Sequence, residues 1–164
     1  MLKMALCVVM AFCAASIYSE ELKVAKEGEM LPDVSAVDQA GATVKLTDFK
    51  GKTGVVVFFI PKAFTPGCTT ESCGFRDESA KYIEKGYTIF GASRDDAATL
   101  AKFKAEYKLP YSYLSDPKGE LAKSLGITPG KRESIVIDKD GKVVKIVKTV
   151  NASKHFTDLL IDLK

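Results

Sequence analysis

Cys68 lies at a point in the chain where a thiol could be chemically reactive. It follows a continuous apolar run, residues 55–60, and a short segment that contains Pro61, Thr65 and Gly67. This pattern is typical of a buried strand, a turn and then the first turn of a helix. The backbone amides and the dipole at a helix N-terminus favour a thiolate over a thiol. The sequence therefore predicts a nucleophilic cysteine at position 68.

The groups around Cys68 suit attack on the O–O bond of a peroxide. Thr65 can place a hydroxyl beside the sulfur and a bound substrate oxygen, and the backbone N–H groups of Gly67 and Cys68 can donate to the same oxygens. Donors that are fixed in advance stabilise the negative charge that develops on the leaving oxygen. The attack would convert Cys68 to a sulfenic acid, which condenses with a nearby thiol to form a disulfide.

Cys73, five residues further along the chain, is the thiol available for that condensation. If both cysteines share one helix, their Cα atoms lie roughly 8.7 Å apart and about 140° apart around the helix axis. A disulfide requires Cα atoms within about 7 Å of each other, so the helix must unwind locally before the bond can form. We therefore interpret Cys68 and Cys73 as a switching pair rather than as a permanent structural disulfide.

The first nineteen residues differ from the rest of the chain. Lys3 precedes a run of apolar and small residues without charge, 4–17, and charged sequence begins at Glu20. This pattern is typical of a secretory signal peptide, and the run is shorter than the roughly 20 residues that span a bilayer. We expect a signal peptide at 1–19 and one domain at 20–164, with an uncleaved N-terminal anchor as the alternative.

Removal of the signal peptide has two consequences for the mature protein. The protein would be exported to a periplasm, to the cell exterior or to an organelle reached through a signal peptide, with no membrane attachment after cleavage. It would also lose Cys7 and Cys13, and would keep Cys68 and Cys73 as its two thiols.

The composition of the 164 residues, 46% apolar and 27% charged, predicts one folded domain. The lysines are scattered among acidic residues and form no basic stripe, so nucleic acid is not an expected partner. Zinc normally takes four Cys, His or carboxylate ligands, and His155 is the single histidine, so neither a metal nor a cofactor is expected. We interpret His155 as an ordinary surface or partly packed residue, with a Cys–His nucleophile pair as the alternative.

Apolar runs with strand character alternate with helical patterns along the chain. Strands are predicted at 35–37, 43–46, 55–60, 87–92, 113–114, 133–138 and 142–147, and helices from Pro66 or Gly67 to Lys85, from Asp95 or Asp96 to Pro110, from Asp116 to Gly126, and after Asn151. This order predicts an α/β fold in which helices cover both faces of a partly parallel sheet and a final hairpin forms an antiparallel edge. We expect a thioredoxin-like three-layer domain with a central mixed sheet.

The motif Pro61-x-x-x-Thr65-x-x-Cys68 resembles the active-site signature of peroxiredoxins. The longer run 59–71, with Cys73 five residues after Cys68, is similar to the peroxiredoxin Q / bacterioferritin comigratory protein subgroup, and the resemblance extends from about residue 31 to residue 163. It implies a thiol peroxidase in which Cys68 is the peroxidatic and Cys73 the resolving cysteine. It also implies an intramolecular disulfide that a thioredoxin-like partner reduces, with hydrogen peroxide and organic hydroperoxides as substrates.

The resemblance assigns roles to further residues of the site. Arg132 stands at the position of the active-site arginine, which would stabilise the thiolate and orient the peroxide, and Pro61 would shield the site. The implied substrate-binding set is Thr65, Gly67, Cys68 and Arg132. Glu71 and Arg76 are candidates only for a supporting role in the site, because charged side chains on a helix surface often have no measurable effect.

The chain departs from the family pattern at three positions near the motif. Ile60 and Ala63 stand where family members usually have Tyr and Asp, and Phe64 lies beside the threonine. These differences leave the peroxide preference open. The chain also ends at Lys164 without the C-terminal resolving-cysteine arm of typical two-cysteine peroxiredoxins, so we expect a monomer.

Two other functions remain as alternatives to the peroxidase. A disulfide exchange protein could use Cys68 and Cys73 on protein substrates, and Thr128-Pro129 before a strand resembles the proline loop of thioredoxins. A redox sensor or holdase could bind a partner when it is oxidised. Separately, Asn151-Ala152-Ser153 matches a glycosylation acceptor, but a helix cap is the interpretation of Asn151 that we favour.

Overall fold

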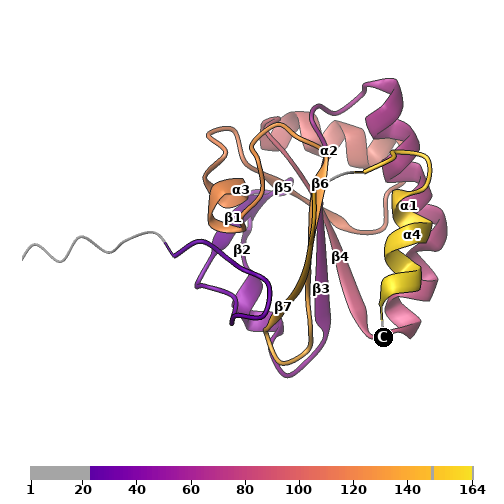
Figure 1. The fold of residues 1–164 in the computed structure, drawn as a ribbon. Coiled ribbons are helices and arrows are strands. Elements are labelled where there is room, and N and C mark those ends of the chain that lie inside the picture. Colours follow the sequence, from indigo (N-terminus) through magenta and orange to yellow (C-terminus); the bar gives the residue numbers. More distant parts are fainter. Residues whose placement is uncertain (1–22, 149, 164) are drawn as a thin grey trace, which may run out of the picture.

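Seven strands form one mixed sheet in a computed structural model of the chain (Figure 1), which describes residues 23–148 and 150–163. The predicted signal peptide at 1–19 lies outside the described residues. Along the chain the elements are β1 (Ser35–Asp38), β2 (Thr43–Lys45), the 3-10 helix η1 (Leu46–Phe49), β3 (Gly54–Phe59), α1 (Pro66–Glu84), β4 (Tyr87–Ser93), α2 (Ala97–Glu106), β5 (Ser112–Ser115), α3 (Glu120–Ser124), β6 (Glu133–Ile137), β7 (Val143–Val147) and α4 (His155–Asp162). Within this part of the chain, no helix is long and apolar enough to cross a membrane.

The sheet has the strand order β2-β1-β5-β4-β3-β6-β7. β3 lies between β4 and β6, and it is buried along its whole length because it has a neighbour on each side and helices on both faces. β3 and β5 both pair parallel with β4, whereas β6 pairs antiparallel with β3 and continues into the hairpin with β7. The predicted mixed sheet with an antiparallel hairpin edge is confirmed.

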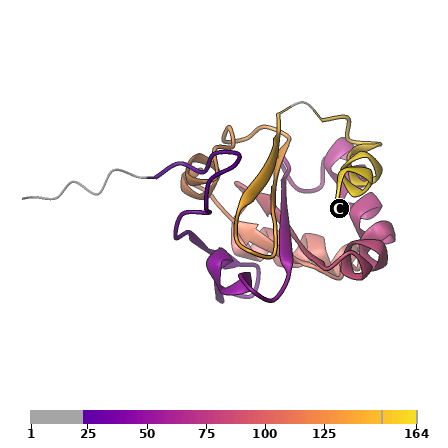
Figure 2. The same ribbon diagram turned by 60° about the horizontal axis from the view of Figure 1, so that its bottom comes forward.

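Two apolar cores lie on opposite faces of the sheet, and alternate residues of β3 enter each of them. Val56 and Phe58 join the core under α1, α2 and α4, whereas Val55 and Val57 join the core under α3 and η1. Figure 2 shows the same separation, with α1 and α4 side by side on one side of the sheet. The fold is therefore the expected three-layer arrangement.

Two helix starts differ from the prediction. α3 begins at Glu120 rather than directly after Asp116, although the buried Asp116 carboxylate accepts hydrogen bonds from the amides of Leu121 (3.1 Å) and Ala122 (3.0 Å). Asn151 does not cap α4 with its side chain. Its carboxamide oxygen instead accepts from the Ser153 amide (3.0 Å) in a turn that precedes the helix. At α3 the Asp116 side chain caps the first helical turn from four residues before the helix begins, whereas at α4 the Asn151 side chain organises the turn that precedes the helix.

Candidate active site

The segment between β3 and α1 is fixed to the end of β4 by Asp95. The Asp95 carboxylate accepts a hydrogen bond from the Ala63 amide (2.7 Å) and another from the Ser93 hydroxyl (2.5 Å). Thr65 is the N-cap residue of α1, and Pro66 is the first residue of the helix, where proline needs no hydrogen-bond partner. Cys68 follows as the third residue of the helix and is only 1% exposed. The predicted location of this thiol in the first turn of a helix is confirmed.

Phe64 has a strained backbone next to this turn. Its φ of 63° lies in the left-handed region, which a bulky side chain rarely adopts. The exposed ring packs edge-on against Phe103 of α2, with ring centroids 5.1 Å apart, and also contacts Tyr107. These contacts hold the aromatic side chain on α2, close in sequence to Thr65 and Cys68.

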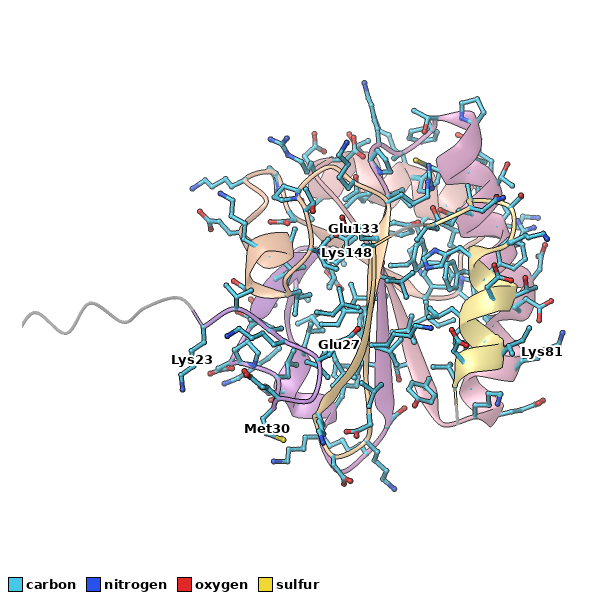
Figure 3. All side chains as sticks on the ribbon, viewed as in Figure 1. Lys23, Glu27, Met30, Lys81, Glu133 and Lys148 are labelled. Carbon is cyan, nitrogen blue, oxygen red and sulfur yellow. The ribbon has the colours of Figure 1, made fainter. Side chains whose placement is uncertain are left out.

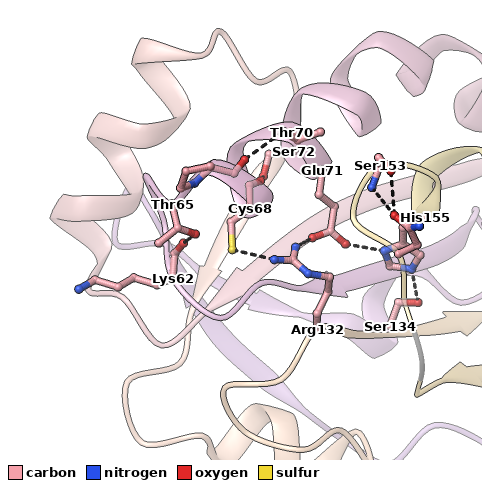
Figure 4. A network of polar contacts seen from close by, with 12 residues as sticks. Lys62, Thr65, Cys68, Thr70, Glu71, Ser72, Arg132, Ser134, Ser153 and His155 are labelled. Atoms are coloured by element: carbon pink, nitrogen blue, oxygen red, sulfur yellow. Dashed lines mark hydrogen bonds and ion pairs between the residues drawn. The ribbon is translucent and has the colours of Figure 1, made fainter.

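Arg132 approaches Cys68 from the loop before β6. Its Nη2 lies 3.2 Å from Sγ of Cys68, and its Nη1 pairs with the Glu71 carboxylate (Figure 4). Burial opposes the charged form, but the attraction to Glu71 and the contact with Cys68 outweigh it and raise the pKa of Arg132. The guanidinium therefore remains a cation beside the sulfur, where a positive charge stabilises a thiolate.

Glu71 is a fully buried member of this site, so the prediction that it is a helix-surface charge was wrong. It lies one turn after Cys68, on the same side of α1. One carboxylate oxygen pairs with Arg132, and the other lies 2.5 Å from Nδ1 of His155. A buried carboxylate needs partners of this kind because its desolvation is costly. Arg76, the other supporting candidate, bonds to Asp77 and to the Tyr107 carbonyl and is not part of the network.

His155 is also buried, at 3% exposure, so the prediction of a surface or partly packed residue was wrong as well. Its Nε2 lies 2.9 Å from the Ser134 hydroxyl of β6, and its ring packs edge-on against Phe75. The alternative of a Cys–His nucleophile pair is not supported, because the imidazole reaches Cys68 only through Glu71 and Arg132 (Figure 4). The signal for burial was the spacing of His155 with Leu159 and Leu163, the buried positions of this segment.

The other predicted site residues surround the sulfur in different ways. Gly67 lies beside the guanidinium, and a Cβ at this position would be 3.4 Å from Nη2 of Arg132. The Thr65 hydroxyl donates to the Lys62 carbonyl (2.9 Å), so it is held near the turn by the backbone rather than by the sulfur. Pro61 is exposed in the loop after β3. The structure thus brings Arg132 to Cys68 and Gly67, whereas the Thr65 hydroxyl is bonded to Lys62 and Pro61 is exposed.

Cys73 lies on α1 with Cys68, is half-buried, and carries a free thiol, as does Cys68. Ser72, which precedes Cys73 and lies one turn after Cys68, is held by a second network. Its hydroxyl donates to the Cys68 carbonyl (2.7 Å) and lies 2.6 Å from the Tyr113 hydroxyl, and its carbonyl accepts from Tyr111 (2.6 Å). Burial raises the pKa of both phenols, which therefore stay neutral.

The donor groups of the site do not form a metal centre. In residues 23–148 and 150–163, no three His, Cys, Asp or Glu side chains are grouped so that they could hold a metal ion. What the arrangement offers is a buried thiol, a fixed cation 3.2 Å from it, and the amides of a helix N-terminus. Such a site can stabilise a thiolate and the negative charge of a leaving oxygen.

Comparisons with known proteins agree with this geometry. The sequence model of the AhpC/TSA family matches residues 28–146. Peroxiredoxin Bcp of Bacillus subtilis is 36% identical over 148 residues, which cover 84% of this chain and 94% of that protein. The crystal structure of peroxidoxin BcpB from Mycobacterium tuberculosis superposes with a TM-score of 0.77 at 33% identity, over 85% of this chain and 96% of that one. A bacterioferritin comigratory protein of Xanthomonas campestris, studied for alkyl peroxide reduction, gives a TM-score of 0.77 at 25% identity, over 84% and 97% of the two chains.

Proposed function

Because the chain belongs to the AhpC/TSA family, as a peroxiredoxin of the peroxiredoxin Q / bacterioferritin comigratory protein subgroup, we propose that Cys68 reduces hydrogen peroxide and organic hydroperoxides. The observation that carries this proposal is the contact of 3.2 Å between Nη2 of Arg132 and Sγ of Cys68. The reduction of alkyl peroxides by the Xanthomonas campestris relative supports the inclusion of organic substrates.

In the first step, the Cys68 thiolate attacks the terminal oxygen of the peroxide and the O–O bond breaks. The sulfur loses two electrons and becomes a sulfenic acid, and the leaving oxygen departs as water or an alcohol after it takes up a proton. The amides of Gly67 and Cys68 are at the start of α1, where they have no carbonyl partner within the helix and can donate to the substrate. Arg132 supplies the positive charge for the transition state.

In the second step, the Cys73 thiol attacks the oxidised sulfur of Cys68, a disulfide forms and water leaves. Both cysteines are in the continuous helix α1, whose ideal geometry separates their Cα atoms by roughly 8.7 Å. Since a disulfide tolerates at most about 7 Å, the first turns of α1 must unwind during each cycle. Local unfolding is therefore a step of the proposed mechanism.

In the third step, a thioredoxin-like dithiol attacks the disulfide and restores both thiols of the peroxidase, while the partner becomes oxidised. Since Cys68 and Cys73 lie in one chain, the cycle requires no second copy, and we propose a monomer. We also propose that residues 1–19 direct the protein to export, and that the partner is a dithiol protein of the same compartment.

Rapid-quench measurements on protein that begins at Glu20 test this mechanism. Mass spectrometry can follow each oxidation state, which is useful because the chain has no tryptophan. We expect Cys68→Ser to abolish the consumption of hydrogen peroxide and cumene hydroperoxide. We expect Cys73→Ser to consume one equivalent and to stop at the sulfenic acid. Normal turnover by Cys68→Ser would exclude the proposal.

Two further assays separate the peroxidase from the alternatives. Reduction of insulin at a rate above that of peroxide turnover would favour a disulfide exchange protein. Stoichiometric loss of peroxide in the presence of a reduced thioredoxin would favour a sensor.

A further inference from the structure

A chain of contacts connects the C-terminal helix α4 with the reactive sulfur. His155 of α4 binds one oxygen of Glu71 at 2.5 Å, and the other oxygen of Glu71 pairs with Arg132 (Figure 4). Nη2 of Arg132 then lies 3.2 Å from Sγ of Cys68. The position of the guanidinium at the sulfur therefore depends on a carboxylate, and one side of that carboxylate depends on His155.

The imidazole of His155 is fixed from three directions. An ionised carboxylate can only accept hydrogen bonds, so Nδ1 of His155 donates to Glu71. Nε2 lies 2.9 Å from the Ser134 hydroxyl, and the ring is edge-on to Phe75 with centroids 5.2 Å apart. His155 and Glu71 are 3% and 0% exposed, so water does not replace these bonds. A side chain held in this way has one orientation, and it imposes that orientation on the carboxylate.

Glu71 also lies between the two cysteines in the sequence, on the turns of α1 that must unwind before the disulfide can form. When these turns unwind, the Glu71 carboxylate has to leave both Arg132 and His155. The contact between His155 and Glu71 therefore favours the folded helix, in which Cys68 meets peroxide, over the unwound helix, in which Cys68 meets Cys73.

We propose that His155 is a positioning residue of the peroxidase, which holds Glu71 so that Arg132 stays at Cys68 and the first turns of α1 stay folded. This inference rests on the proposed function. It gives His155 opposite effects on the two chemical steps. The reaction with peroxide is faster because Arg132 is in place, and disulfide formation is slower because Glu71 must first be released.

Two substitutions distinguish the two nitrogens of the imidazole. In His155→Asn, the amide nitrogen can occupy the place of Nδ1 and donate to Glu71. In His155→Gln, the longer side chain carries its nitrogen to the place of Nε2, toward Ser134. We expect the Gln variant to form the sulfenic acid roughly tenfold more slowly, because it loses one hydrogen bond to a charged group. We also expect it to form the disulfide several-fold faster. We expect the Asn variant to be within about threefold of wild type in both steps.

Leu159→Ala is the matched control for packing. Leu159 is one turn further along α4 and is 2% exposed, but its side chain is apolar and has no polar bond to Glu71. Its truncation weakens the attachment of α4 without removing the hydrogen bond. Ser134→Ala is a second variant that should fold readily, because it removes only a hydroxyl. It leaves the imidazole hydrogen-bonded to Glu71 and packed on Phe75 but free at Nε2, so we expect the same direction of change as for His155→Gln with a smaller size.

Each rate is measured by rapid quench on variants whose folding is checked by circular dichroism. The inference is overturned if the Asn and Gln variants behave alike, if Leu159→Ala reproduces the Gln variant at equal stability, or if Ser134→Ala changes the rates in the opposite direction. Alkylation of Cys68 by iodoacetamide provides a test that needs no peroxide. We expect it to slow in the Gln variant, to slow less in Ser134→Ala, and to stay close to the wild-type rate in the Asn and Leu159→Ala variants. If wild type consumed no peroxide, the proposed function would fail, and the alkylation rates would still decide whether His155 positions Arg132.

Discussion

Nη2 of Arg132 lies 3.2 Å from Sγ of Cys68, although the two residues are 64 positions apart in the sequence. The fold creates this contact because β3 and β6 are adjacent antiparallel strands. The segment that leaves the end of β3 toward Cys68 and the loop that enters the start of β6 from Arg132 therefore meet at the same edge of the sheet. The guanidinium is held there as a cation by Glu71, so the sulfur has a permanent positive neighbour.

Replacement of Arg132 by lysine tests whether this neighbour acts through its charge alone. Lysine keeps the charge but lacks the planar fork that bonds to Glu71 and Cys68 at the same time. We expect Arg132→Lys to lower the second-order rate with hydrogen peroxide by about 100-fold, the loss of one fixed donor to a reacting centre. Rapid quench measures the rate. The exposed neighbour Lys131 provides the control, because Lys131→Met should react with hydrogen peroxide at the wild-type rate. A wild-type rate for Arg132→Lys would contradict the role assigned to the Arg132 guanidinium.

Truncation of Glu71 should destabilise the fold as well as the site. Glu71→Ala leaves the Arg132 guanidinium and the His155 imidazole without their common partner in a buried region. We expect the free energy of unfolding to fall by roughly 2 to 4 kcal/mol, below the maximum for a broken buried pair, because the Arg132 side chain keeps 19% exposure. Urea unfolding followed by circular dichroism measures this change.

Glu71→Gln is the matched variant, because it keeps the size and one acceptor oxygen of the side chain. It should lose less stability than Glu71→Ala but should still slow the reaction of Cys68 with peroxide, since Arg132 loses its ion pair. Equal stabilities of wild type and Glu71→Ala would show that the buried network contributes nothing to the fold.

The strands and the reactive thiol could be predicted from local sequence, because each depends on near neighbours in the chain. An apolar run, a turn and a helix start suffice to locate Cys68 in the first turn of α1, after β3. Arg132 was located through the family resemblance, since no local pattern marks an arginine in a loop as a partner of a distant sulfur. The mixed sheet was predictable for the same local reasons, although the order of its strands was not.

Glu71 and His155 could not be identified in the same way. A glutamate on a helix is exposed in most proteins. Glu71 is buried here because α1 packs against α4 and meets the loop before β6. Its two partners, Arg132 in that loop and His155 in α4, lie 61 and 84 positions away in the sequence. The spacing of His155 with Leu159 and Leu163 indicates a buried face, but the partner of the imidazole depends on tertiary structure. Hydrogen bonds between polar side chains of different helices, strands and loops leave no periodic pattern in the sequence.

Glu133, next to Arg132, should make the stability of the protein depend on pH. Its carboxylate accepts from the Thr128 amide (2.8 Å) and pairs with Lys148 (2.7 Å; Figure 3), and thereby closes the loop that carries Arg132. Burial alone would raise the pKa of Glu133, but the bonds from Lys148 and Thr128 outweigh it and hold the pKa below the ordinary value of 4.5. The folded state therefore binds the proton less readily than the unfolded chain, so the stabilisation is present above pH 4.5 and is lost as the pH falls through the lower pKa of the folded protein.

Comparison with Glu133→Gln isolates this contribution, because all other carboxylates titrate alike in both proteins. At neutral pH we expect wild type to have a larger free energy of unfolding than the variant. We expect this difference to be smaller at about pH 3.5, below the ordinary pKa of glutamate. Urea unfolding at the two pH values measures it. A difference that stays constant or grows on acidification would show that Glu133 is not held as an anion by these bonds.

Gly74 sets how closely α4 can approach α1. A Cβ at this position would lie 2.1 Å from the ring of Phe156, so the two helices can pack at their present distance only without a side chain there. Gly74→Ala gains up to about 1 kcal/mol in helix propensity. It forces the Phe156 ring and α4 outward, which costs roughly 1 to 3 kcal/mol. We therefore expect a net loss in the free energy of unfolding, measured with urea.

A double-mutant cycle with Phe156→Ala separates the two effects. When the ring is absent, the alanine at position 74 meets no clash, so Gly74→Ala should become neutral or stabilising in that background. Because α4 also carries His155, the single Gly74→Ala variant should form the disulfide between Cys68 and Cys73 faster than wild type does. If Gly74→Ala cost the same stability in both backgrounds, the contact with Phe156 would not be the reason for glycine at this position.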